Sequence, residues 1–203
     1  ENMIFGSAVH RAIDQILKSG KIILPEDKKA AKVVEVWVEK RLAEITQDRL
    51  SEQSVCVSDK RFPHLSMYGK IDLIETLSKG VLRVTDFKTG SPRKKSEIEK
   101  KDDEGRMGNH LRQLAMYAYL INESPKWQAE VRESRLEFVE AKNPVETFYD
   151  TVIKGDQIGL LLKDIEDYNE LVKKGEWLER PCNYKSYGKN TECAYCQMSQ
   201  IEG

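Results

Sequence analysis

Two apolar segments, 66–75 and 81–88, contain acidic residues where buried strands are expected, and this feature constrains the fold of the chain most strongly. Side chains alternate along a strand, so Asp86 and Lys88 leave the backbone on one face, behind apolar residues of that same face. A neighbouring strand can bring Asp72 alongside them. Because an unpaired buried carboxylate is costly, the pattern predicts a sheet in which two carboxylates meet an ammonium group or a metal ion.

Such a group of side chains suits a divalent cation that prefers oxygen ligands. Asp72 and Asp86 offer hard carboxylate ligands, while Lys88 can orient a water or balance charge on an attacked phosphate. The chemistry that this predicts is phosphodiester hydrolysis. The alternative is a solvated surface or an ion pair, since a D-x-K tripeptide is common in a chain that is 33% charged.

Four motifs in order give the chain a family resemblance. They are 6–10 (GSAVH), 69–72 (GKID), 86–90 (DFKTG) and 113–117 (QLAMY). With them the chain resembles the RecB-like branch of the PD-(D/E)XK nucleases, the nuclease domains of RecB- and AddB-type helicase-nucleases. Each motif is weak alone, but four in order are specific. The resemblance implies an α/β fold with a restriction-endonuclease-like mixed β-sheet flanked by helices.

The resemblance also implies roles for individual residues. His10, Asp72 and Asp86 would bind Mg²⁺ or Mn²⁺, with the backbone carbonyl of Phe87 as a further ligand. Lys88 would serve catalysis. Taken without the other motifs, His10 lies at the border of an apolar helical stripe, where a histidine is ordinarily structural.

Further residues are expected around this site. By resemblance, Gln113 and Tyr117 support the site or the DNA strand, although a surface glutamine and a core tyrosine are the alternatives. Glu52 is the nearest candidate for an additional family glutamate, but its polar surroundings predict an exposed residue without a role. A basic cluster follows the DFKTG motif and is expected either to contact DNA phosphates or to form a solvated loop: Arg93, Lys94 and Lys95.

Hydrophobic periodicity and turn residues predict a mixed order of helices and strands. A helix that carries His10 and a second helix after Pro25 are expected first. After them we expect strands at 54–58, 66–75 and 81–88, and a long mobile connection over 89–108. We then expect a helix from 109, a hairpin of 135–141 and 147–153, and a last helix capped by Asp156.

The four cysteines are expected to differ in role. Cys56 lies in a strand-like segment and is predicted to be a small buried hydrophobe. Cys182, Cys193 and Cys196 lie in a C-terminal loop, 180–203, and the C-x-x-C spacing is typical of a metal or cluster site. An iron-sulfur cluster, a zinc ion and ordinary thiols all remain open.

Length and composition predict one domain over 1–203. Because the sequence starts without an initiator methionine and the first motif follows within a few residues, we expect a domain excised from a longer protein. No apolar stretch is long enough to span a bilayer, so a cytoplasmic protein without membrane attachment is expected. The net charge of −1 argues against a uniformly basic nucleic-acid binder, although local patches remain open.

The predicted function is a metal-dependent DNA nuclease, by resemblance an exonuclease. Its expected partners are DNA and a helicase domain or subunit, in DNA repair or recombination. The alternatives are a non-catalytic DNA-binding or scaffolding domain of the same fold and a stand-alone CRISPR-adaptation-type exonuclease.

Overall fold

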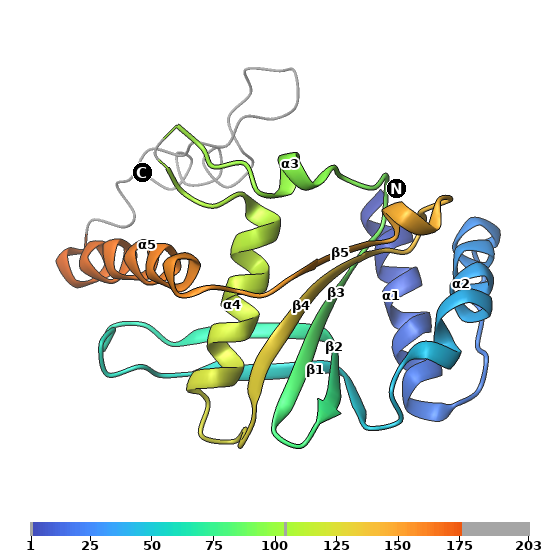
Figure 1. Cartoon of the computed structure of the whole chain (residues 1–203), viewed down its shortest axis with the longest axis horizontal. Helices are drawn as coiled ribbons and strands as arrows, with labels where there is room; N and C mark the ends of the chain where they lie inside the picture. The colour runs from blue at the N-terminus through green and yellow to red at the C-terminus, as the bar shows by residue number, and fades with distance from the viewer. Residues whose placement is uncertain (1, 104, 176–203) are drawn as a thin grey trace, which may run out of the picture.

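Five strands form one mixed sheet in the computed structural model, which describes residues 2–103 and 105–175 (Figure 1). The strands lie in the order in which they follow one another along the chain, and only β3 and β4 pair in parallel. Their bounds are β1 Arg49–Val57, β2 Met67–Ser78, β3 Val81–Lys88, β4 Glu130–Phe138 and β5 Phe148–Thr151. The predicted α/β class with a mixed sheet is confirmed.

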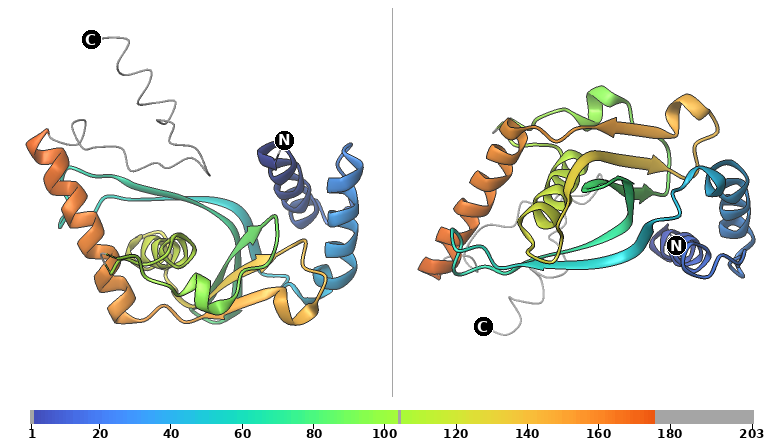
Figure 2. Two further views of the ribbon diagram at one scale, coloured as in Figure 1. Left: turned by 90° about the horizontal axis from the view of Figure 1, so that it is seen from above. Right: turned by 60° about the horizontal axis from the view of Figure 1, so that its bottom comes forward.

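Helices cover both faces of this sheet (Figure 2). They are α1 Asn2–Ser19, α2 Lys28–Arg41, α3 Lys95–Ile98, α4 Asn109–Glu123 and α5 Gly155–Lys174, with single 3₁₀ turns at Leu42–Glu44 and Pro144–Glu146. On one face, α4 and α5 pack over the sheet. On the other face α1 and α2 pack together. None of the helices within the described ranges is long and apolar enough to cross a membrane.

Two adjacent residues of β2 show how the sheet divides the core. Leu73 packs with the residues of α1 and α2, including Ile13 and Trp37, whereas Ile74 packs with Leu120 and other residues of α4 and α5. This opposition follows from the alternation of side chains along a strand. Burial of each large aliphatic side chain stabilises the fold by about 1.5–3 kcal/mol.

The parallel pair β3–β4 places α4 beside the end of β3. Parallel neighbours need a crossover connection, and here that connection contains α3 and α4. The chain leaves β3 at Lys88 and returns through α4, so the first turns of α4 lie at the carboxyl end of β3. Gln113 is thereby carried close to Asp86 and Lys88.

The connection between β3 and α4 differs from the prediction of a mobile segment. Its Ile98 and Met107 are buried, with exposed fractions of 1% and 2%. Lys101 and Met107 also form an isolated β-bridge. Ile98 and Met107 are separated by polar residues and follow neither the helical nor the strand period, so the sequence pattern did not predict their burial.

Smaller corrections concern β1 and α5. The strand β1 begins at Arg49, five residues before the predicted start. Cys56 is exposed rather than buried, because Val55 and Val57 occupy the core side of the alternation. The residue before α5 is Lys154, whose N–H group donates to Gln157 Oε1, so Asp156 lies inside the first turn instead of capping it.

Candidate active site

Two strands bring the predicted carboxylates together. The antiparallel register pairs Leu73 with Thr85, so the next position along the ladder sets Asp72 opposite Asp86. The N–H group of Phe87 donates to Asp72 Oδ2 at 2.7 Å, which holds this carboxylate at the end of β3.

Helix α1 and strand β1 add two more side chains. His10 Nδ1 lies 3.3 Å from Asp72 Oδ1, and one ligand atom each of His10, Glu52 and Asp72 lie within 4.8 Å of one another. Glu52 therefore lies in this cluster, and the prediction that it is an exposed residue was wrong. Its side chain is 16% exposed and forms an ion pair with Lys70.

The backbone of Glu52 is unusual for its residue type. Its φ of 51° lies in the left-handed region, between Ser51 and Gln53, which pair with β2 on either side. A non-glycine residue in this region carries strain, and such strain concentrates at functional sites. The distortion interrupts strand alternation at the point where β1 faces the site.

A hydrogen-bonded group surrounds Asp86 on the α4 side of the sheet. Gln113 Nε2 donates to Asp86 Oδ1 at 2.7 Å, and the Tyr117 hydroxyl donates to the same oxygen at 3.3 Å. Lys88 Nζ lies 2.8 Å from both Asp86 Oδ2 and Gln113 Oε1. Tyr117 is also a buried core residue, so its two predicted roles are compatible.

The crowding of acidic groups alters their proton affinity. Burial and the charge of Asp72 raise the pKa of Asp86 to about 6, although Lys88 and His10 act in the opposite direction. For His10, burial lowers the pKa, but the hydrogen bond and charge of Asp72, together with Asp86 and Glu52, outweigh it, so the pKa is raised. Burial, with the charges of Asp86 and Asp72, also raises the pKa of Tyr117.

These residues fit a divalent cation. Carboxylate oxygens and an imidazole nitrogen are suitable donors for Mg²⁺ or Mn²⁺. Three carboxylates, those of Glu52, Asp72 and Asp86, gather here, and the buried Asp86 Oδ2 has the ion pair with Lys88 but no further hydrogen bond among the described residues. A cation would offset this excess of negative charge.

A polar cavity of about 430 Å³ opens beside the cluster. The side chains of α1, β1 and β2 line it: Gly6, Ser7, His10, Arg11, Asp14, Glu52 and Lys70. At Gly6, a Cβ atom would lie 3.0 Å from Thr89 Oγ1, so glycine allows α1 to approach the end of the DFKTG motif. This contact links the first and third motifs in space.

The remaining predicted residues lie farther out. Arg93, Lys94 and Lys95 are exposed in the connection after β3. Burial, together with the charges of Lys88 and Arg93, lowers the pKa of His110 in the first turn of α4. Cys182, Cys193 and Cys196 and the loop 180–203 lie outside the described residues, so their roles stay predictions.

The sequence did not predict a role for Glu52 or Lys70, both of which line the cavity. Their ion pair joins β1 to β2 across the cavity edge. Lys70 belongs to the GKID motif, but a motif does not show which strand lies opposite it.

A mixed sheet that brings carboxylates, a lysine and a glutamine together near the end of β3 is the arrangement of a restriction-endonuclease-like fold. The chain belongs to the PD-(D/E)XK nuclease superfamily, whose family model matches residues 1–201. A solved structure of a candidate exonuclease from Eubacterium rectale has a TM-score of 0.50 at 15% identity, covering 92% of this chain and 76% of that chain. At this identity the likeness bears on the fold alone.

A second solved structure, that of SSO0001, has a TM-score of 0.42 at 15% identity, covering 97% of this chain and 83% of that chain. A comparison with curated proteins gave no match. The RecB-like branch within the superfamily stays a prediction from the four motifs.

Proposed function

We propose that this protein is a metal-dependent deoxyribonuclease that hydrolyses phosphodiester bonds. The observation that carries the proposal is the convergence of His10, Glu52 and Asp72 within 4.8 Å, beside the buried Asp86 and Lys88. Separate elements supply these residues, and their chemistry matches hydrolysis of a phosphodiester. A solvated surface, the alternative for a lone D-x-K tripeptide, would not bury Asp86 to 3% exposure.

In this proposal, His10, Glu52, Asp72 and Asp86 hold Mg²⁺ or Mn²⁺, with the carbonyl of Phe87 as a further ligand. The bound cation supplies Lewis-acid stabilisation of the phosphate and lowers the pKa of a coordinated water. Hydrogen bonds within the protein hold two of these carboxylates in place, because the Phe87 N–H group donates to Asp72 Oδ2 and Gln113 Nε2 donates to Asp86 Oδ1.

Lys88 has a different part, because an ammonium group cannot ligate a cation. Its Nζ atom is held by Asp86 and by Gln113 Oε1, at the inner end of the site. From there it can orient the attacking water or balance charge that develops on the phosphate. Tyr117 and Gln113 keep this lysine and Asp86 in one arrangement.

The finer assignment follows the family resemblance. We propose an exonuclease, and the structurally similar Eubacterium rectale protein is itself described as a candidate exonuclease. The four motifs support a nuclease module of a helicase-nuclease that acts in DNA repair or recombination. Arg93, Lys94 and Lys95 are exposed and able to contact DNA phosphates.

Two variants separate metal binding from turnover. The unmodified protein should degrade DNA in the presence of Mn²⁺ or Mg²⁺, and EDTA should stop this cleavage. Lys88→Ala should retain Mn²⁺ binding by calorimetry while its turnover falls by at least about 10²-fold, whereas Asp72→Ala should lose both.

The exposed Lys163 of α5 provides the control for lysine removal, and Lys163→Ala should cleave like the parent. Thermal unfolding of every variant distinguishes lost chemistry from lost folding. If Lys88→Ala keeps full turnover but melts at a lower temperature, Lys88 is a structural counter-ion and the catalytic assignment fails.

A further inference from the structure

The outer face of the β1–β2 hairpin continues from the candidate active site. The hairpin extends past α4 toward α5 (Figure 1). A Cβ atom added at Gly69 would lie 2.6 Å from Leu120 Cδ1, so this position of β2 faces α4 closely. The neighbouring Tyr68 and Lys70 therefore point to the opposite side, on which the polar cavity opens.

Tyr68 is a large aromatic residue left in solvent on this face. Its exposed fraction is 64%, so the ring does not contribute much to the core. The Tyr68 hydroxyl lies 2.8 Å from Ser54 Oγ, and Ser54 is the register partner of Lys70. The hydrogen bond therefore directs the ring along the hairpin toward the cavity and restricts its rotation.

Spacing places this ring within reach of a bound strand. Tyr68 precedes Asp72 by four residues, which corresponds to about 13 Å along a strand. Lys70 lies between them and lines the cavity, with its ammonium group on Glu52. A chain of phosphates that leads out from the carboxylate cluster would thus pass a lysine first and an aromatic face next.

We infer that the outer face of the β1–β2 hairpin binds single-stranded nucleic acid, with one base stacked on the ring of Tyr68. This inference rests on the proposed nuclease function and adds the strand type of its substrate. Every base has an apolar face that stacks on an aromatic side chain, and single-strand binding proteins combine such rings with positive charge. In a duplex the bases are already stacked inside the helix, so Tyr68 has no face to bind.

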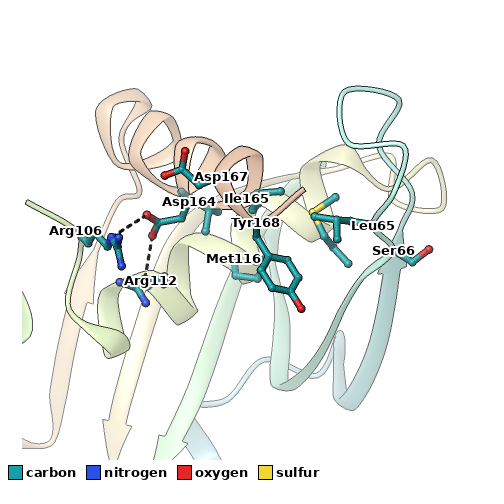
Figure 3. A pocket seen from close by; sticks show the side chains of 11 residues that line it. Leu65, Ser66, Arg106, Arg112, Met116, Asp164, Ile165, Asp167 and Tyr168 are labelled. Atoms are coloured by element: carbon teal, nitrogen blue, oxygen red, sulfur yellow. Dashed lines mark ion pairs between the residues drawn. The ribbon is translucent and has the colours of Figure 1, made fainter. Parts of the chain in front are cut away.

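A second exposed tyrosine among the described residues has different surroundings. Tyr168, with an exposed fraction of 47%, lines a pocket of about 340 Å³ between α4 and α5 (Figure 3). The arginines of this pocket, Arg106 and Arg112, form ion pairs with Asp164. None of the proposed metal-holding side chains lines this pocket, so Tyr168 is a matched control for Tyr68.

Fluorescence anisotropy of the full chain with labelled oligonucleotides tests the inference. An Asp86→Asn background keeps the strand intact during the measurement. Tyr68→Ala should weaken binding of a single strand by about 5- to 150-fold and leave duplex binding unaltered. Tyr68→Phe, which keeps the ring, and Tyr168→Ala should both bind single strands like the background protein.

A second measurement reports stacking directly. A strand that carries 2-aminopurine should lose fluorescence on binding, and Tyr68→Ala should restore that fluorescence. Single-strand binding that is unchanged in Tyr68→Ala, or an equal loss with duplex or in Tyr168→Ala, overturns the inference. The proposed function is tested separately, by cleavage of a nitrophenyl ester of a mononucleotide by the parent protein, because this short substrate does not extend to Tyr68.

Discussion

Replacement of Asp86 by asparagine is expected to stabilise the protein and to abolish its proposed activity. Burial and the charge of Asp72 raise the pKa of Asp86 from 3.8 to about 6. Since tenfold in proton affinity corresponds to about 1.4 kcal/mol, the ionised carboxylate lowers the free energy of unfolding by about 3 kcal/mol at neutral pH. Asparagine removes this charge and retains an oxygen that can accept from Gln113.

The sign of the pH dependence follows from the raised pKa. Below about pH 3 the carboxyl is largely protonated in the folded and unfolded states, so it carries almost no penalty. As the pH rises from about 4 to above 6, the unfolded chain ionises first and the parent protein loses stability relative to Asp86→Asn. The difference between the two proteins should therefore be near zero at about pH 3 and reach about 3 kcal/mol at about pH 8.

Urea unfolding at both pH values, in the presence of EDTA, measures this difference. In thermal unfolding at the higher pH, the melting temperature of the variant should exceed that of the unmodified protein by about 6–12 °C. Asp167→Asn, a change at an exposed carboxylate of α5, serves as the control and should show no such pH-dependent gain. A variant that is less stable than the parent at both pH values would refute the reasoning, as would a difference independent of pH.

Two further changes test how the fold supports the site. Glu137 is fully buried and accepts hydrogen bonds from Trp37 Nε1 at 2.8 Å and from Arg41 Nε at 3.1 Å. Glu137→Ala should therefore lower the free energy of unfolding by about 3–5 kcal/mol, and a loss below about 1 kcal/mol in urea unfolding would contradict this. Gly69→Ala should lower the free energy of unfolding by about 1–3 kcal/mol, because the added Cβ would meet Leu120. Gly159→Ala, with no neighbour within 4 Å, should instead raise it by up to about 1 kcal/mol, and equal calorimetric melting temperatures of the two variants would contradict both expectations.

Local periodicity was sufficient for much of the framework. The strand β3 has the predicted bounds, Val81–Lys88, because its alternation and its preceding turn are encoded within a few residues. The four-residue spacing of Gln113 and Tyr117 predicted a shared helical face, and both side chains contact the carboxylate of Asp86. Motif order also predicted the nuclease superfamily.

Other features depended on which elements pack together. The strand-like sequence around Cys56 does not show which face of the strand is buried. In the folded chain Val55 and Val57 lie on the core side, and this leaves Cys56 exposed. Ile98 and Met107 anchor a connection that has no regular period, because Ile98 packs with residues of α4, β4 and β5 and Met107 packs with residues of α4 and α5.

Glu52 shows most clearly where sequence reasoning ends. By itself the sequence determined the strand alternation, the helical faces and the residue types that suit a cation. Only the tertiary structure decided that Glu52 joins His10 and Asp72, because this depends on the β1–β2 register, a left-handed backbone at Glu52 and the docking of α1. Side-chain chemistry is a local property of the chain, whereas convergence of groups far apart in sequence is set by the packing of the whole sheet.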